Sequence, residues 1–122
     1  MRPFSVNKSN SLKSTSEIDA VFKDGSKLSS KLISLYYAKS KEHGRLRFTF
    51  SVGKKTHALA TTRNKLKRLM KEALRINGDE YLNHNLSYNL VFVYFSSKEE
   101  SYKYVEKSMK SLLLSFKNKT LS

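Results

Sequence analysis

Residues 45–78 of this chain read RLRFTFSVGKKTHALATTRNKLKRLMKEALRING. The first eight residues alternate between polar or basic positions and the apolar positions Leu46, Phe48, Phe50 and Val52. Strict alternation is typical of a strand with one buried face, so we expect a strand over residues 45–52. Farther along, apolar residues recur at the spacing of one helix face, at Leu66, Leu69, Met70, Ala73 and Leu74. The stretch therefore predicts a half-buried strand followed by an amphipathic helix.

The limits of this central helix follow from its flanking residues. Thr61 or Thr62 can cap the first turn, because a hydroxyl oxygen accepts hydrogen bonds from the free backbone N–H groups there. Asn77-Gly78 is a common terminator, so we expect the helix to end at about Ile76.

Upstream of this stretch the sequence predicts a short helix and a second strand. Ser14 and Glu17 have the spacing of a capping box, and Gly25 is a plausible helix stop. Residues 27–38 are β-like, and a polar turn with one glycine joins them to the strand at 45–52. We expect these two strands to form a hairpin.

Downstream of the central helix we expect a third strand and a last helix. Residues 90–95 are continuously apolar, as in a strand that is covered on both faces. Ser97 and Glu100 form a second capping box, and an apolar stripe continues to Phe116. The expected order of elements is α-β-β-α-β-α, with room for one extra short strand.

The domain organisation is simple, because 122 residues are enough for one modest core and no internal repeat is visible. We expect a single α+β domain over residues 14–118. Residues 1–13 are polar and carry three basic side chains, which is typical of a flexible basic arm, and residues 119–122 form a C-terminal tail.

Charge is the unusual feature of the composition, with 24 Lys+Arg against 10 Asp+Glu and a net charge of +14. Residues 39–75 hold twelve basic residues against two acidic ones, a net +10, so most of the excess lies in one segment. A charge that served only solubility would be spread more evenly. The clustering favours a polyanion-binding face.

Most of these cations fall on one side of the central helix, opposite its leucine stripe. At ~100° per residue, that side gathers Asn64, Lys67, Arg68, Lys71 and Arg75. Only Glu72 offers local compensation for the repulsion, so phosphate groups would stabilise the helix. The alternative is an ordinary solvated face, although such faces usually mix charges of both signs.

The sequence offers no recognisable catalytic or metal site. It has no cysteine, and His43, His57 and His84 are isolated at positions that we expect to be exposed. The acidic residues form no dyad, because neighbouring carboxylates on a helix do not face each other. No apolar run is long enough to cross a membrane and the start resembles no signal peptide, so we expect a cytoplasmic protein without a membrane partner.

One sequence motif is more specific evidence of function than the positive charge. Ser51-Val52-Gly53-Lys54-Lys55 is followed after seven residues by Arg63-Asn64-Lys65-Leu66-Lys67-Arg68-Leu69-Met70-Lys71-Glu72-Ala73. It resembles the signature of the protein subunit of bacterial ribonuclease P, in which an Arg-Asn-Arg core is followed by Lys-Arg and a later Arg-Glu. The resemblance extends over about residues 13–118.

The resemblance implies a fold and a function. The fold would be a four-stranded mixed sheet with helices packed on one side and a left-handed βαβ crossover, contrary to the general right-handed rule. The function would be to bind the catalytic ribonuclease P RNA and the 5′ leader of precursor tRNA. The protein subunit would be non-catalytic, because the RNA and its Mg²⁺ ions remove the leader, and no obligatory protein partner is evident.

The resemblance also implies two sets of site residues. The first would contact the catalytic RNA and comprises Lys54, Lys55, Arg63, Asn64, Lys65, Lys67, Arg68, Lys71 and Arg75. The second would line a leader-binding cleft between the first helix and the sheet and comprises Ile18, Phe22, Lys31 and Tyr36. Three positions depart from the family pattern: Lys65 and Lys71 replace arginines, and Ile18 replaces a common aromatic residue.

Two other functions fit parts of the sequence. A ribosomal or other structural RNA-binding protein without a processing role shares the small size, the charge and the α+β fold. A basic amphipathic protein that acts on membranes or DNA is the second alternative. For Phe22, simple core packing competes with a role in the cleft, because it shares the apolar helix face with Ile18 and Val21.

Overall fold

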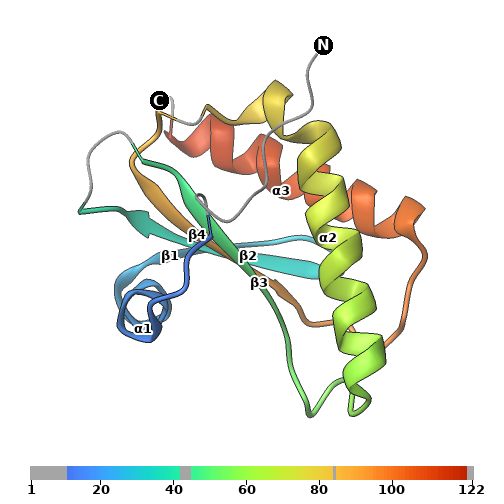
Figure 1. Cartoon of the computed structure of the whole chain (residues 1–122). Coiled ribbons are helices and arrows are strands. Elements are labelled where there is room, and N and C mark those ends of the chain that lie inside the picture. Colours follow the sequence, from blue (N-terminus) through green and yellow to red (C-terminus); the bar gives the residue numbers. More distant parts are fainter. Residues whose placement is uncertain (1–10, 42–44, 84, 121–122) are drawn as a thin grey trace.

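The structure is a computed structural model that describes residues 11–41, 45–83 and 85–120. Three helices and four strands follow one another in the order α1-β1-β2-β3-α2-β4-α3 (Figure 1). Their bounds are Thr15–Asp24 for α1, Ser26–Ser29 for β1, Ile33–Lys39 for β2, Arg47–Val52 for β3, Ala60–Tyr81 for α2, Tyr88–Tyr94 for β4 and Tyr102–Thr120 for α3. The expected α+β class with one extra short strand is confirmed, and the extra strand is β1.

The four strands form one mixed sheet in the order β1-β2-β4-β3. Strands β1 and β2 form an antiparallel hairpin, β2 pairs antiparallel with β4, and β4 pairs parallel with β3. The expected hairpin between β2 and β3 is wrong, because β4 lies between them. Strand β4 is apolar on both faces, which requires a central place in the sheet.

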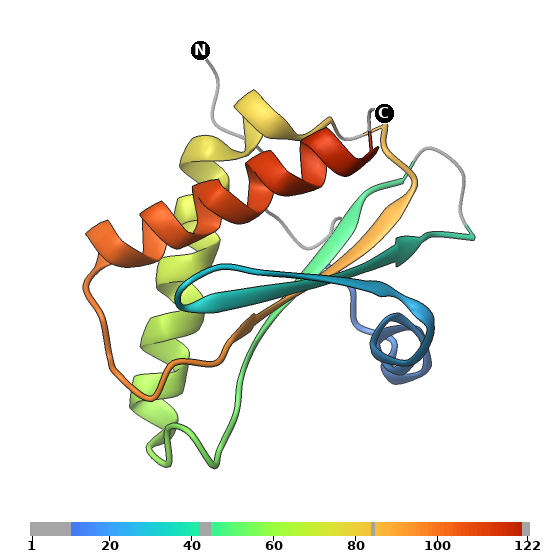
Figure 2. The same ribbon diagram turned by 180° about the vertical axis from the view of Figure 1, so that it is seen from behind.

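The connection from β3 through α2 to β4 is a left-handed crossover, which is rare between parallel strands. In Figure 1 strand β3 lies nearer to the viewer than its parallel neighbour β4, and Figure 2 shows the opposite order from behind. In Figure 1 the chain runs down β3, turns counterclockwise up through α2 and returns to the start of β4 farther from the viewer. A path that turns counterclockwise as it recedes is left-handed, so the left-handed crossover is confirmed.

The helices cover both faces of the sheet. Helices α2 and α3 pack on one face over the main core, which includes Leu35, Phe92, Leu66 and Met109. Helix α1 packs on the opposite face, where a smaller core joins Leu12, Val21 and Val91 (Figure 2). Successive strand residues point to opposite faces, so Val91 and Phe92 belong to different cores. The expectation that the helices pack on one side is therefore wrong for α1.

Helix α1 has the predicted ends. The Ser14 hydroxyl accepts a hydrogen bond from the Glu17 backbone N–H at 3.4 Å, and the Gly25 N–H closes the last turn on the Val21 carbonyl at 2.9 Å. A Cβ at Gly25 would lie 2.4 Å from the Val21 carbonyl oxygen and 2.6 Å from that of Tyr37. Glycine therefore lets the helix end directly against β2.

Helix α2 is longer than predicted at both ends. It begins at Ala60 after Leu59, and no side chain caps it. It continues through Asn77-Gly78 to Tyr81, with Gly78 buried inside it. The Leu82 N–H closes the last turn on the Gly78 carbonyl at 2.7 Å, and Lys117 of α3 donates a hydrogen bond to the Glu80 carbonyl at 3.3 Å.

Helix α3 begins at Tyr102, later than the Ser97–Glu100 capping box predicted. The buried Tyr94 hydroxyl donates to the Lys98 carbonyl at 2.7 Å and accepts from the Glu100 N–H at 3.2 Å. These bonds hold the segment before α3 in a loop. At its other end α3 runs to Thr120, so residues 119 and 120 belong to the helix and not to a tail.

The N-terminal arm, expected over residues 1–13, was predicted to extend too far along the sequence. Leu12 is buried, and its N–H donates to the Phe48 carbonyl at 3.0 Å. Ser11 forms a parallel bridge with Phe48. Residues 11–12 are therefore part of the folded domain, and residues 1–10 of the expected arm lie outside the described residues.

Candidate nucleic-acid interface

The outer side of α2 presents the cations that the helical phasing predicted. Its inner side is buried through Leu66, Met70, Ala73 and Leu74. We call the polar side formed by Asn64, Lys67, Arg68 and Lys71 the α2 basic face. Asn64, Arg68 and Lys71 are exposed and Lys67 is partly so. Within the described part of the chain none of its three cations forms an ion pair, so the face is ready to attract phosphates.

Two further cations of α2 are already paired. Arg75 donates two hydrogen bonds to the Glu72 carboxylate, at 3.1 Å and 2.6 Å. The Arg75 hydrogen bond holds the pKa of Glu72 below its usual value. Lys65 lies 2.9 Å from a Glu99 carboxylate oxygen in the loop before α3. Arg75 and Lys65 therefore offer less charge to an external anion than the α2 basic face does.

Arg63 positions the loop that leads into α2. Its guanidinium donates to the His57 carbonyl at 2.9 Å and to the Ala58 carbonyl at 2.8 Å. The His57 N–H closes a turn on Gly53 at 3.0 Å, which leaves Lys54 and Lys55 exposed. The resemblance implied that Arg63 contacts the catalytic RNA, and here its guanidinium is bound to two carbonyls of the loop that carries Lys54 and Lys55.

His57 is not exposed as expected. It is buried, and its Nε2 lies 2.8 Å from the Ser96 carbonyl oxygen. Its ring also contacts Tyr94 edge-on, at 5.8 Å between ring centroids. His57 therefore anchors the loop before α2 to the end of β4. His43 and His84 lie outside the described residues.

A second candidate surface lies on the other face of the sheet, beside α1. The Phe22 and Tyr36 rings meet edge-on, with their centroids 4.8 Å apart, and Phe22 is 43% exposed. Ile18 packs with Tyr36 against the small core under α1. The structure therefore brings together three of the four residues expected in a cleft between α1 and the sheet.

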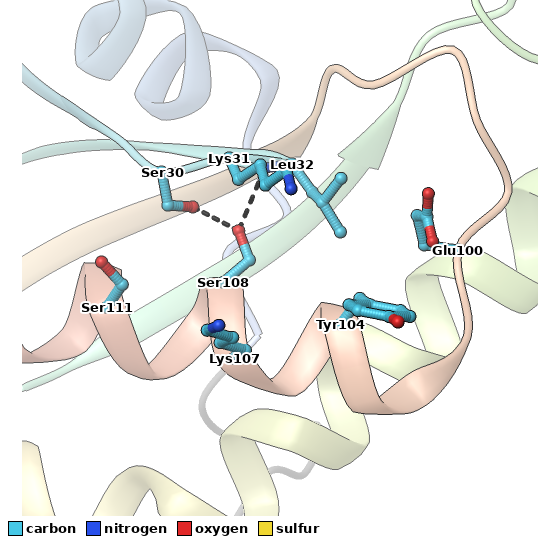
Figure 3. Close-up of a pocket in the computed structure, with 8 residues that line it drawn as sticks. All are labelled: Ser30, Lys31, Leu32, Glu100, Tyr104, Lys107, Ser108 and Ser111. Atoms are coloured by element: carbon cyan, nitrogen blue, oxygen red, sulfur yellow. Dashed lines mark hydrogen bonds between the residues drawn. The ribbon is translucent and has the colours of Figure 1, made fainter.

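Lys31 does not belong to this group. It lies in the turn between β1 and β2 and lines a pocket beside α3 with Leu32 and Tyr104, on the other side of the sheet (Figure 3). Lys27 occupies the position beside Tyr36 that was expected for Lys31, because Lys27 pairs with Tyr36 in the β1–β2 register. The Lys27 ammonium lies 5.4 Å from the centre of the Tyr36 ring. The hairpin register that determines this was not predicted.

Hydroxyl groups extend the surface beside Tyr36, and the sequence analysis did not include them. Ser34 and Ser51 both pair with Val93 of β4 in the sheet register, and Thr49 pairs with Val91. All point to the α1 side, because they alternate with core residues. We use the name α1-side groove for the expected leader cleft, formed here by the α1-facing residues Phe22, Tyr36, Ser34, Ser51 and Val93. Of these, Ser34 is buried and shares a hydrogen bond with the Ser29 hydroxyl at 3.0 Å. The polar positions of the alternating strand were the signal that could have found Ser51 and Thr49.

The comparisons with known proteins identify the family. The family model "Ribonuclease P" matches residues 6–117. This chain belongs to the ribonuclease P protein family. It is 37% identical over 108 residues to the ribonuclease P protein component of Clostridioides difficile strain 630, covering 88% of this chain and 91% of the relative. It is 38% identical over 104 residues to that of Clostridium kluyveri, covering 84% and 89%.

Solved ribonuclease P proteins share the fold. The Staphylococcus aureus protein superposes with a TM-score of 0.76 at 21% identity, covering 89% of this chain and 96% of the other. The Thermotoga maritima protein superposes with a TM-score of 0.69 at 21% identity, covering 84% and 94%. The family is the bacterial ribonuclease P protein component, whose role is RNA binding in tRNA 5′ maturation. The resemblance seen in the sequence is confirmed.

Among residues 11–41, 45–83 and 85–120 of this ribonuclease P protein, no three of the His, Asp and Glu side chains gather as metal ligands would. Nor does any helix in the same segments have the length and apolar character needed to span a membrane.

Proposed function

We propose that this chain is a non-catalytic subunit of a ribonuclease P particle with two separate RNA surfaces. The α2 basic face, with Lys54 and Lys55, binds the catalytic RNA. The α1-side groove holds the single-stranded 5′ leader of precursor tRNA. The observation that carries the proposal is a row of α2 cations that form no ion pair within the described residues. It lies on the far side of the sheet from the half-exposed aromatic pair of Phe22 and Tyr36.

The α2 basic face suits a structured RNA. Lys67, Arg68 and Lys71 lie on one side of a helix fixed by its buried leucine stripe, so they present charge at fixed positions. Each phosphate that they neutralise releases counterions, which favours binding at moderate salt. Asn64 lies in the same row and can donate to a phosphate or a base edge. Lys65 and Arg75 can join if the RNA displaces their carboxylate partners.

The α1-side groove suits an unpaired strand. Unpaired bases stack on aromatic rings, and Phe22 and Tyr36 offer rings that are already held in contact. Lys27, beside Tyr36, can attract the phosphates, and the Ser51 hydroxyl can bind sugar or phosphate oxygens. A duplex would not expose its bases to these rings. The groove therefore favours a single-stranded leader.

The protein positions RNA, and the chemistry belongs to the RNA. In this proposal Mg²⁺ ions are held by the catalytic RNA, and the protein contributes by binding and orienting the substrate. A particle of this kind works in the bacterial cytoplasm, and no further protein partner is required.

Binding measurements test whether the protein recognises the catalytic RNA. Fluorescently labelled protein is titrated with bacterial ribonuclease P RNA and with random duplex DNA of equal charge, at several salt concentrations. We expect tighter binding to the structured RNA and a steep salt dependence. Equal affinity for both nucleic acids would show a merely basic protein and refute the proposal.

A further inference from the structure

A pocket of about 450 Å³ lies between the β1–β2 turn and the first half of α3 (Figure 3). Neither surface of the proposed function includes it. Its volume is in the range of pockets that bind small ligands. Leu32 and Tyr104 line it from the turn and from α3, and in Figure 3 Glu100 and Ser111 lie at its opposite ends.

The floor of the pocket is built before any ligand arrives. The Ser108 hydroxyl accepts a hydrogen bond from the Leu32 N–H at 3.1 Å and contacts the Ser30 hydroxyl. The Ser30 hydroxyl in turn donates to the Ile33 carbonyl at 2.8 Å. These bonds tie the turn to α3 across the sheet edge. A ligand therefore meets a fixed cavity rather than a loop that must first be ordered.

The charged groups around the pocket select the kind of ligand. Lys31 and Lys107 line it from two different elements, so a phosphate can bind between them. Glu100 adds a carboxylate, which repels a simple anion but accepts hydrogen bonds from the amino groups of a base. None of these three groups forms an ion pair with another described residue. Together they match a molecule that carries both a phosphate and a donor-bearing edge.

The walls of the pocket offer an aromatic and an apolar side chain to the ring of a ligand. Tyr104 is 51% exposed, although a tyrosine ring gains stability when it is covered. Leu32 forms an apolar surface on the turn side of the pocket. A flat ring that enters here can stack on Tyr104, as unpaired bases stack on aromatic side chains. We propose that this pocket binds one unpaired nucleotide.

The position of the pocket points to the catalytic RNA as the source of that nucleotide, and this step rests on the proposed function. The pocket lies on the α2–α3 side of the sheet, away from the α1-side groove. Glu99, next to the lining residue Glu100 in sequence, pairs with Lys65 of α2 at 2.9 Å, so the loop at one end of the pocket contacts α2. RNA bound along α2 can therefore extend into the pocket.

The test compares variants of the full chain in titrations with ribonuclease P RNA. Tyr104→Ala should weaken binding roughly 5- to 150-fold, the loss of one base stacked on an aromatic ring. Tyr104→Phe keeps the ring and should bind as the parent does. Leu114→Ala removes another exposed apolar side chain of α3 outside the pocket and should also leave the affinity unchanged.

The lysines provide a second readout. Lys107→Ala should reduce the slope of log affinity against log salt by about one. Lys110→Ala removes an exposed lysine of α3 that does not line the pocket, and its slope should stay as it was. Unfolding temperatures of the variants show that the fold is intact.

Arg68→Ala in the same titrations separates the two proposals. If Arg68→Ala weakens binding but Tyr104→Ala and Lys107→Ala do not, the pocket proposal is refuted and the proposed function stands. If Arg68→Ala has no effect either, the proposed function is refuted as well. A photoreactive phenylalanine at position 104 should crosslink to one unpaired nucleotide of the catalytic RNA in the assembled particle. Crosslinks to precursor tRNA alone would overturn the assignment of the pocket.

Discussion

The cations of α2 differ in whether an acidic side chain already binds them. Arg68 is exposed and has no acidic partner among the described residues, whereas Arg75 is held by Glu72 through two hydrogen bonds. Helix α2 therefore carries one arginine, Arg68, that is available to an RNA and another, Arg75, that is bound to a carboxylate. This pair allows the contribution of an unpaired charge to be measured.

Arg68→Ala should weaken binding to ribonuclease P RNA by about 1.5 to 3 kcal/mol, the typical value of a hydrogen bond to a charged group. It should also lower the salt-dependence slope by about one, because one phosphate contact is lost. Arg75→Ala is the matched control and should have a smaller effect. Fluorescence titrations at four or more salt concentrations give both quantities. Equal effects of the two substitutions would contradict the assignment.

Tyr36→Ala should reduce the preference of the assembled enzyme for precursor tRNA over mature tRNA. Loss of one stacked base corresponds to about 1 to 3 kcal/mol. Affinity for the catalytic RNA should not change, because Tyr36 lies on the α1 side of the sheet. Tyr36→Phe keeps the ring and serves as the control. The ratio of the two substrate dissociation constants is the measurement, and an unchanged ratio would remove Tyr36 from the groove.

For single residues, the sequence predicted which side of an element a side chain lies on better than it predicted which other residue that side chain contacts. The helical phasing of Asn64, Arg68 and Lys71 was correct, because a regular helix fixes which residues share a side. The engagement of Lys65 could not be predicted, because Glu99 reaches it from a loop far along the chain. Lys31 was misplaced for a similar reason, because the β1–β2 register decides which lysine lies beside Tyr36.

Among the elements, the junction between α1 and β1 depends on one glycine. Gly25→Ala should destabilise the protein by about 1 to 3 kcal/mol, the usual cost of overpacking, because its Cβ would meet two backbone carbonyls within 2.6 Å. Gly53→Ala is the control, because the nearest atom to its Cβ would be the Thr56 hydroxyl oxygen at 3.6 Å. Urea unfolding measures both variants. Similar stability of the two would show that the junction can relax.

The contact between α2 and α3 contains a titratable tyrosine. Burial, with a hydrogen bond to Glu106, raises the pKa of Tyr102 to about 12 from an ordinary 10.0. The protonated phenol is therefore favoured by folding, and its contribution is complete below pH 10 and lost as the pH rises toward 12. The Tyr102 hydroxyl lies 3.0 Å from the Glu106 carboxylate.

Tyr102→Phe reveals this contribution as a difference in stability from the parent. We expect the difference in the free energy of unfolding to be constant up to about pH 10 and to change between pH 10 and 12, because only the parent then loses stabilisation. Subtraction of the variant cancels the titration of the lysines. Denaturant unfolding at pH 8 to 12 provides the values, and a difference that is independent of pH would contradict the raised pKa.

Element types were easier to predict than element ends. The alternating strand and the leucine stripe each have a clear period, so β3 and α2 were expected in the right places. The C-terminal end of α2 and the start of α3 depend on tertiary contacts, namely the burial of Gly78 and Leu82 and the bonds of Tyr94 to the loop before α3. Local signals such as Gly78 and the Ser97–Glu100 spacing were overridden by these contacts.

For the whole molecule, the sheet order was the feature that local pattern could not give. A glycine-containing turn between two strands indicates a hairpin, yet β4 separates β2 from β3. The apolar character of β4 on both faces was the correct clue to its central position. The left-handed crossover came only from the family resemblance, because general rules favour the opposite hand. It carries the α2 basic face to the side of the sheet opposite the α1-side groove.

Cleavage of precursor tRNA by the reconstituted particle tests the central claim most directly. Bacterial ribonuclease P RNA is assayed at low Mg²⁺ with and without the full-length protein. The account predicts that added protein increases the rate of 5′-leader removal, because the cations of α2 assist assembly and the groove assists substrate binding. No gain in cleavage at any protein concentration would contradict it.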